Sequence, residues 1–150
     1  MIEQFKQQWY SRINNSNRLA AYARYKHDFN FEEYLDTIPS SKHRKVLTKF
    51  RVSSHDLNIE TGRHFGIVGV ERTCKLCTMG RVENEYHFLL ACPFYKDLRE
   101  KHLPRYYCHW PNLHKFDNLM SKQSKMSNLR LSKFLYQANM RRAAAMNAMQ

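Results

Sequence analysis

Glycine and proline are scarce in this chain, with four of each among 150 residues. Tight hairpins depend on both residues, so their scarcity favours a fold built from helices with few such turns. The chain also lacks any apolar run near the roughly 20 residues that a membrane-spanning helix needs, which argues against a membrane protein. We therefore expect a mainly α-helical protein.

Sequence motifs of common enzymes are missing as well. No two aspartates adjoin, although a nucleotide polymerase needs clustered aspartates to hold its two metal ions. A glycine-rich phosphate loop, a Gly-x-Ser-x-Gly elbow and a His-Glu-x-x-His helix are also lacking. The acidic pairs Glu32-Glu33 and Glu83/Glu85 are expected to be solvated or to form ion pairs. We expect no enzymatic activity and no small-molecule substrate.

Acidic residues are scarce relative to basic ones. Thirteen Asp and Glu stand against 25 Lys and Arg, which gives a formal charge of +12 and a pI near 9.7. This excess favours a polyanionic partner, RNA or DNA. Hydrophobic residues make up 43% of the chain, enough for one modest core or two small ones. The polar, charged start resembles no signal peptide, so we expect an intracellular protein, nuclear or cytoplasmic.

The cysteines are few but patterned. Cys74 and Cys77 are followed by His87 and Cys92 in a C-x2-C-x9-H-x4-C array. Zn²⁺ favours a closed tetrahedron of thiolate and imidazole donors, with bonds of about 2.3 and 2.0 Å, and three cysteines with one histidine form a common structural version. Because protein fills all four positions, we predict one structural zinc ion with no chemistry of its own.

Local sequence fits this geometry. Gly80 can take the positive φ of a turn, and residues 82–90 are expected to form a short helix that carries His87. A spacing of five places His87 and Cys92 about 140° apart on a regular α-helix. Pro93 disfavours α geometry for the preceding residue, so we expect the helix to end before Cys92, which can then turn back to the metal.

Other interpretations of the cysteines stay open. Four cysteines are an even number, which permits disulfides, and the cluster can also be read as buried free cysteines beside a core histidine. The ligand set itself can differ by one member. Cys108, His102 or His109 can replace one ligand, most plausibly Cys92.

Apolar periodicity predicts the helices. They are expected over 1–13, 31–36, 41–51, 95–102 and 111–120, with a last helix that starts near Ser124 or Ser127. An extended piece is expected over 55–60, and the periodicity of 19–34 is ambiguous. The last helix has an apolar stripe of Leu131, Phe134, Leu135 and Ala138. We divide the chain into a basic, aromatic-rich helical segment (1–52), a CCHC zinc-binding module (53–104) and a C-terminal helical segment (105–150).

Several of these motifs together resemble a known family. Residues 47–55, 57–63, the Cys74/Cys77 pair and 85–95 are similar to the zinc-binding region downstream of the reverse transcriptase in non-LTR (LINE-type) retrotransposons, most clearly over 47–103. The resemblance implies that Cys74, Cys77, His87 and Cys92 hold zinc. It also implies that the domain helps a polymerase to hold its element RNA or target DNA, with the remainder of a reverse transcriptase as a possible partner. The polymerase's catalytic part is missing.

Nucleic-acid binding is the leading function on these grounds, through a zinc-stabilised module. The expected phosphate contacts are Lys42, Lys45, Lys49, Arg51, Arg63, Arg72, Lys75 and Arg81. Each of these residues also has a purely structural interpretation. A lysine-rich helix face is usually only solvated, and Arg63 can form an ion pair with Glu60 three residues earlier. Aromatic residues that can stack on unpaired bases are Tyr22, Tyr25, Phe65 and Tyr107, although an aromatic side chain in a small helical domain usually belongs to its core.

Two further classes of function stay open. The zinc site can brace a protein-interaction module whose Leu131, Phe134 and Leu135 stripe meets a partner. The chain can also be a degenerate fragment of a mobile element that folds without a selected function.

Overall fold

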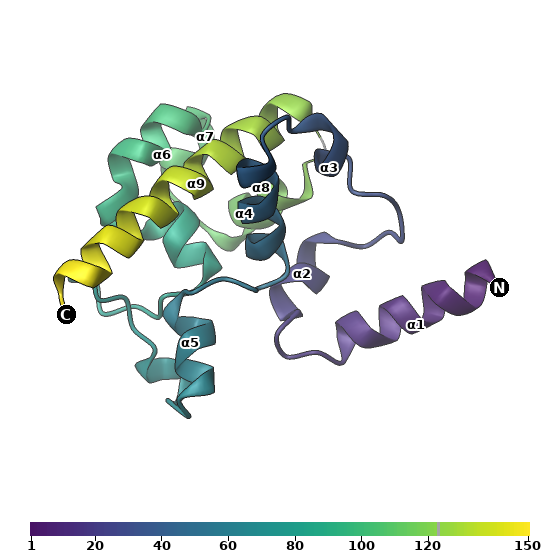
Figure 1. Cartoon of the computed structure of the whole chain (residues 1–150), viewed down its shortest axis with the longest axis horizontal. Coiled ribbons are helices and arrows are strands. Elements are labelled where there is room, and N and C mark those ends of the chain that lie inside the picture. Colours follow the sequence, from purple (N-terminus) through teal and green to yellow (C-terminus); the bar gives the residue numbers. More distant parts are fainter. Residues whose placement is uncertain (123) are drawn as a thin grey trace.

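The computed structural model describes residues 1–122 and 124–150 and confirms a mainly α-helical fold (Figure 1). Within these residues, extended pairing is limited to one antiparallel bridge between Thr73 and Val82. The α-helices are α1 (Ile2–Asn14), α2 (Ala20–Tyr25), α3 (Tyr34–Thr37), α4 (Ser41–Arg51), α5 (Asn58–His64), α6 (Lys96–His102), α7 (Arg105–Cys108), α8 (Leu113–Ser121) and α9 (Lys125–Ala148). Single turns are the 3₁₀ turns η1 (Gly69–Glu71) and η3 (Pro93–Tyr95) and the π turn η2 (His87–Ala91).

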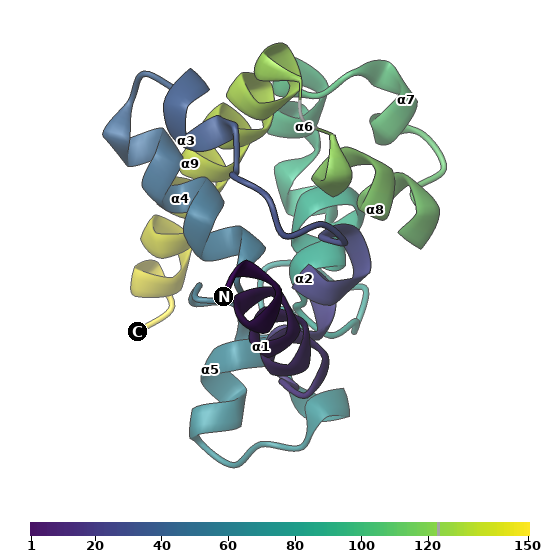
Figure 2. The ribbon, with the colours of Figure 1, turned by 90° about the vertical axis from the view of Figure 1, so that its right-hand side faces the viewer.

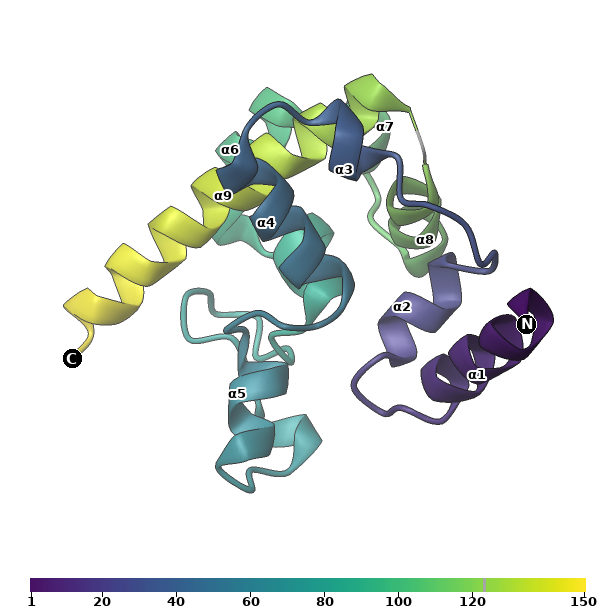
Figure 3. The ribbon, with the colours of Figure 1, turned by 45° about the vertical axis from the view of Figure 1, so that its right-hand side comes forward.

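The long helix α9 organises the body of the molecule. It packs along α4 on one side and α6 on the other (Figures 1 and 3). Its predicted apolar stripe is confirmed as core, since Leu131, Phe134, Leu135 and Ala138 are all buried. The same burial makes the stripe wrong as a docking surface for a partner, because α4 and the central core already cover it.

Phe88 lies at the centre of the apolar core. Its ring is 4.8 Å from that of Tyr95, 6.0 Å from Phe50 and 6.1 Å from Phe134, measured between centroids. One cluster of buried side chains joins residues from Tyr25 to Ala138, so all three predicted segments contribute to a single core. The segment that carries the cysteines is therefore also central to the packing.

Two sequence-based expectations for local structure are wrong. The extended piece expected over 55–60 is wrong for 58–60, because α5 begins at Asn58, whereas Leu57 just before it does have extended backbone. Its first amide donates to the carboxylate of Glu83 at 2.8 Å, a cap supplied from 25 residues away that local sequence does not reveal. The helix expected over 82–90 is shorter, since helical structure starts only at Glu85. The four-residue helix α7 was not expected at all.

Serine side chains cap the first turns of α4 and α9. Ser40 accepts a hydrogen bond from the amide of His43 at the start of α4, and Ser124 does the same for Ser127 at the start of α9. Ser124 is one of the two positions at which the last helix was expected to start. Side-chain oxygens at this position satisfy amides that the first helical turn leaves unpaired.

Helix α1 extends away from the body and packs against α2 (Figures 2 and 3). Its apolar spacing correctly predicts a helix, but only Ile13 of the apolar stripe is buried, while Ile2 and Phe5 are exposed. Trp9 packs edge-on against Phe29 at 5.6 Å. Throughout the described ranges, each helix is too short or too polar to cross a lipid bilayer.

Candidate metal centre

The structure brings the four predicted ligands together. One donor atom from each of Cys74, Cys77, His87 and Cys92 lies within 4.8 Å of the other three. Two edges of this group are 4.0 Å, between the sulfurs of Cys74 and Cys92, and 3.4 Å, between the Cys77 sulfur and His87 Nε2. A zinc tetrahedron has edges of about 3.8 Å between sulfurs and about 3.5 Å from sulfur to nitrogen. The cluster can therefore hold one metal ion.

The first two ligands come from a short loop closed by the Thr73–Val82 bridge. The amide of Cys74 donates to the Arg81 carbonyl at 2.8 Å, and Gly80 has a φ of +64°, as its place in the turn predicted. The amide of Leu76 points at the Cys74 sulfur at 3.4 Å. Such a bond favours the thiolate form, which is the form that binds a metal.

The other two ligands lie at either end of the π turn. The amide of Cys92 donates to the carbonyl of His87 at 2.7 Å, a bond five residues long that places both residues on one side of the turn. Cys92 itself is extended, with a ψ of 122°, and Pro93 follows. The predicted end of the helix before Cys92 is confirmed. The π turn that removes the 140° separation was not expected.

Hydrogen bonds favour the charged thiolate at Cys74, and burial opposes it. Cys74, His87 and Cys92 are buried, and Cys77 is partly exposed. The hydrogen bond with Cys92 lowers the pKa of Cys74 to about 3, and contacts with His87 and the Leu76 amide act in the same direction. That same bond to Cys74 raises the pKa of Cys92. A bound Zn²⁺ ion would favour the thiolate at both sulfurs.

The alternative ligands lie elsewhere. The Cys108 sulfur points at the Arg99 carbonyl at 3.6 Å, His102 bonds to Gln137 at 3.0 Å, and His109 accepts from Arg105 at 3.2 Å. All four cysteines are free thiols. The geometry therefore favours the CCHC set over a disulfide and over any exchange of ligand.

Two buried arginines support the metal-binding segment, which we define as residues 72–93. Arg99 donates to the carbonyl of Leu89 at 2.8 Å and to that of Cys92 at 2.9 Å, so it fixes the backbone that presents the last ligand. Arg142 of α9 forms a two-pronged pair with Glu83, at 2.7 and 2.8 Å. Sequence reasoning missed both roles, because a basic residue in a basic chain gives no local sign of burial.

The acidic pair Glu83/Glu85 is buried, and both members are bonded. Glu83 is 2% exposed and joins Arg142 to the start of α5. Glu85 accepts from the Ser53 hydroxyl at 2.6 Å and bonds to His55 at 2.8 Å. The expectation that these carboxylates are solvated or ion-paired is confirmed for Glu83 by its pair with Arg142, and Glu85 is held by Ser53 and His55 instead of by solvent.

The predicted phosphate contacts lie in different environments. Lys42, Lys45 and Lys49 are exposed along α4, and Lys75 and Arg81 are exposed on the metal-binding segment. Arg63 pairs with Glu60 at 3.3 Å, which is the structural alternative that the sequence suggested. Arg72 donates to the carbonyls of Ile67 and Ile59, so its guanidinium ties α5 to the following loop.

The prediction is wrong for Arg51. Its side chain is 3% exposed, donates to the Met120 carbonyl at 2.6 Å and pairs with Glu32 at 3.3 Å. Rings of three tyrosines surround its guanidinium at 5.0 to 5.8 Å. Arg51 shares the inward face of α4 with Leu47 and Phe50, at a spacing of three and four residues, and this periodicity was the available signal. It anchors the N-terminal segment instead of meeting a phosphate.

The four aromatic residues that were expected to be able to stack on bases differ in their exposure to solvent. Tyr25 and Tyr107 are buried, so the core alternative holds for both and neither ring is free to stack on a base. Tyr22 is half-buried and donates to Glu32 at 3.1 Å. Phe65 alone of the four is freely exposed, in the loop after α5.

A groove of about 390 Å³ lies between α4 and α9. Lys42, Lys45 and Lys49 line it from α4, and Tyr136 and Met140 line it from α9. Nearby, burial lowers the pKa of His43, and the positive charge of Lys133 lowers it further. This face of the molecule therefore concentrates positive charge beside an apolar hollow.

Comparison with protein-family models, with curated proteins and with solved structures gave no match for this chain. The resemblance to the retrotransposon zinc-binding region stays a prediction that rests on the motifs alone.

Proposed function

We propose that this chain is a noncatalytic, zinc-stabilised module that binds the phosphate backbone of RNA or DNA. The observation that carries the proposal is the row of Lys42, Lys45 and Lys49 on the exposed face of α4. Their spacing of three and four residues places them on successive turns of one face. Ion pairs between described residues engage none of the three.

The charge distribution supports this surface as a site for a polyanion. Ion pairs engage eight of the 25 Lys and Arg residues within the described chain, and several of these lie in the core or at its edge. Most of the remaining positive charge faces solvent, where each phosphate that it neutralises releases condensed counterions. Binding of this kind is insensitive to sequence.

The metal has a structural part in the proposal. Cys74, Cys77, His87 and Cys92 would hold one Zn²⁺ ion, and no coordination position would remain for a substrate. Zinc would fix the segment that presents Lys75 and Arg81. The motif resemblance agrees with this function, and it adds the remainder of a reverse transcriptase as a proposed partner.

A salt titration tests the proposal. We expect log affinity for a labelled oligonucleotide to fall linearly with log salt concentration. The variant Lys42→Gln/Lys45→Gln/Lys49→Gln should reduce that slope by about three. The matched control Arg12→Gln/Lys125→Gln/Arg130→Gln removes the same charge from exposed positions elsewhere, and we expect a smaller change from it. Equal effects of the two triple variants, or no binding at low salt, would contradict the α4 site.

A further inference from the structure

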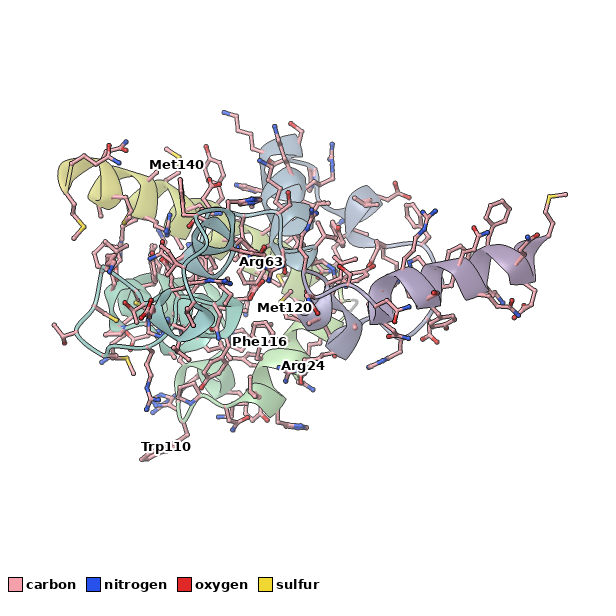
Figure 4. The ribbon with its side chains drawn as sticks, turned by 90° about the horizontal axis from the view of Figure 1, so that it is seen from below. Arg24, Arg63, Trp110, Phe116, Met120 and Met140 are labelled. Carbon is pink, nitrogen blue, oxygen red and sulfur yellow. The ribbon has the colours of Figure 1, made fainter. Side chains whose placement is uncertain are left out.

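Trp110 is the most exposed large aromatic side chain in the part of the chain that the structure describes. Its side chain and backbone together are 88% exposed, and Figure 4 shows the indole projecting from the body between α7 and α8. An indole has the largest apolar ring system of any side chain, so full exposure to water is unfavourable unless something covers it. In the described structure, no other part of the protein covers the Trp110 indole.

The backbone at this position is constrained. Trp110 has a φ of +47°, in the left-handed region that residues other than glycine and asparagine seldom adopt. The surrounding chain holds it there. Lys115 donates to the carbonyls of Tyr106 and His109, and the Asn112 side chain donates to the Trp110 carbonyl at 3.4 Å. Strain that the neighbouring hydrogen bonds maintain is a mark of a functional position.

The environment of Trp110 is positively charged. Residues 101–116 include two lysines, one arginine and three histidines, and no aspartate or glutamate. The next acidic residue, Asp117, is already paired with Arg24 at 2.7 Å. Tyr106, on the preceding helix, is 55% exposed and has the Lys115 ammonium 4.5 Å from its ring centroid.

We propose that Trp110 is a stacking platform for an unpaired base of single-stranded RNA or DNA, with Tyr106 as a second ring nearby. This inference rests on the proposed nucleic-acid binding and adds the strandedness of the ligand. Every base has a flat π face, which an exposed indole matches without reading sequence. The positive surroundings attract the phosphates on either side of that base. A duplex keeps its bases stacked and offers no free face to the ring.

The chain is well suited to a direct test, because it has only two tryptophans. Trp9 is half-buried against Phe29, and the conservative change Trp9→Phe leaves Trp110 as the sole indole emitter. The probes are a twelve-nucleotide oligouridylate, the same length of oligothymidylate, an abasic strand of equal charge and a blunt duplex. A fluorescent label on each strand reports binding independently of the indole.

We expect both single strands to quench Trp110 emission, and the duplex and abasic strand to quench it far less. Trp110→Ala should weaken single-strand binding by about 5- to 160-fold, the range for loss of one stacked base, with an unchanged salt slope. Trp110→Phe should keep most of the affinity, because a ring remains. Since the side chain is exposed, neither change should lower stability, which urea unfolding checks.

The labels separate the two proposals. Labelled strands that bind equally to the original protein and to Trp110→Ala would overturn the platform and leave nucleic-acid binding intact. Equal affinity for the abasic strand and the oligothymidylate would overturn it as well. No binding of any strand at low salt would overturn both proposals together.

Discussion

Removal of the metal should unfold the whole domain and not the metal-binding segment alone. The reason lies in the three residues that follow His87. Phe88, Leu89 and Leu90 are almost completely buried, and Phe88 contacts α4, α9 and the turn at Tyr95. If the π turn unfolds when the metal is lost, these three side chains leave the core.

The size of this effect follows from burial. Each of these three side chains stabilises the fold by about 1.5–3 kcal/mol, so together they contribute about 5–9 kcal/mol. A domain of this size has a total stability of about 5–15 kcal/mol. Structural zinc sites themselves bind with about 10–16 kcal/mol near neutral pH. The loss of metal and core together is thus comparable with the whole free energy of unfolding.

Hydrogen exchange measured with and without a zinc chelator tests the prediction. We expect amide protection in α4 and α9 to disappear together with protection in residues 72–93, and added zinc to restore all three. A far-UV circular dichroism titration should give the same midpoint. Protection that survives in α4 and α9 after chelation would refute the reasoning. Absence of stoichiometric metal in protein purified under reducing conditions would refute the zinc site itself.

Three further predictions concern individual side chains. Cys77→Ser should cost several times more stability in urea unfolding than Cys108→Ser, because only Cys77 belongs to the donor group; equal costs would make the ligand assignment wrong. Arg142→Met should cost about 3–5 kcal/mol, since Glu83 would remain buried without its counter-ion, and the double variant Glu83→Gln/Arg142→Met should regain most of that loss. The hydrogen bonds from Arg141 lower the pKa of Asp97 from its ordinary value of 3.8 to about 2, so this contact contributes fully above pH 3.8 and is lost as pH falls through 2. A carboxyl NMR titration should show the pKa near 2, and Arg141→Gln should return it toward 3.8.

The sequence predicted the features that depend on near neighbours. Zinc-ligand spacing is local, so the group of Cys74, Cys77, His87 and Cys92 could be predicted without a fold. The end of the helix before Cys92 followed from Pro93, and the start of α9 was expected near Ser124. Each of these signals acts within a few residues of its effect.

Features that depend on distant partners escaped prediction. Arg51 is buried because Glu32 and the Met120 carbonyl, 19 and 69 residues away, satisfy its guanidinium. Arg142 is buried because of Glu83, 59 residues earlier. The π turn at His87–Ala91 brings His87 and Cys92 to one side of the chain, and no single residue in it indicates that the turn is wider than an α-helical one.

The Glu83–Arg142 pair sets a limit on how this chain can be shortened. A fragment that ends between residues 93 and 141 keeps all four metal donors but leaves the Glu83 carboxylate, which is 2% exposed in the whole chain, without its guanidinium partner. The amide of Asn58 at the start of α5 would still donate to Glu83, but the negative charge of Glu83 would be buried without a counter-ion. Any minimal expression fragment that is meant to bind metal should therefore include about the first five turns of α9, through Arg142, even though the last donor lies fifty residues upstream.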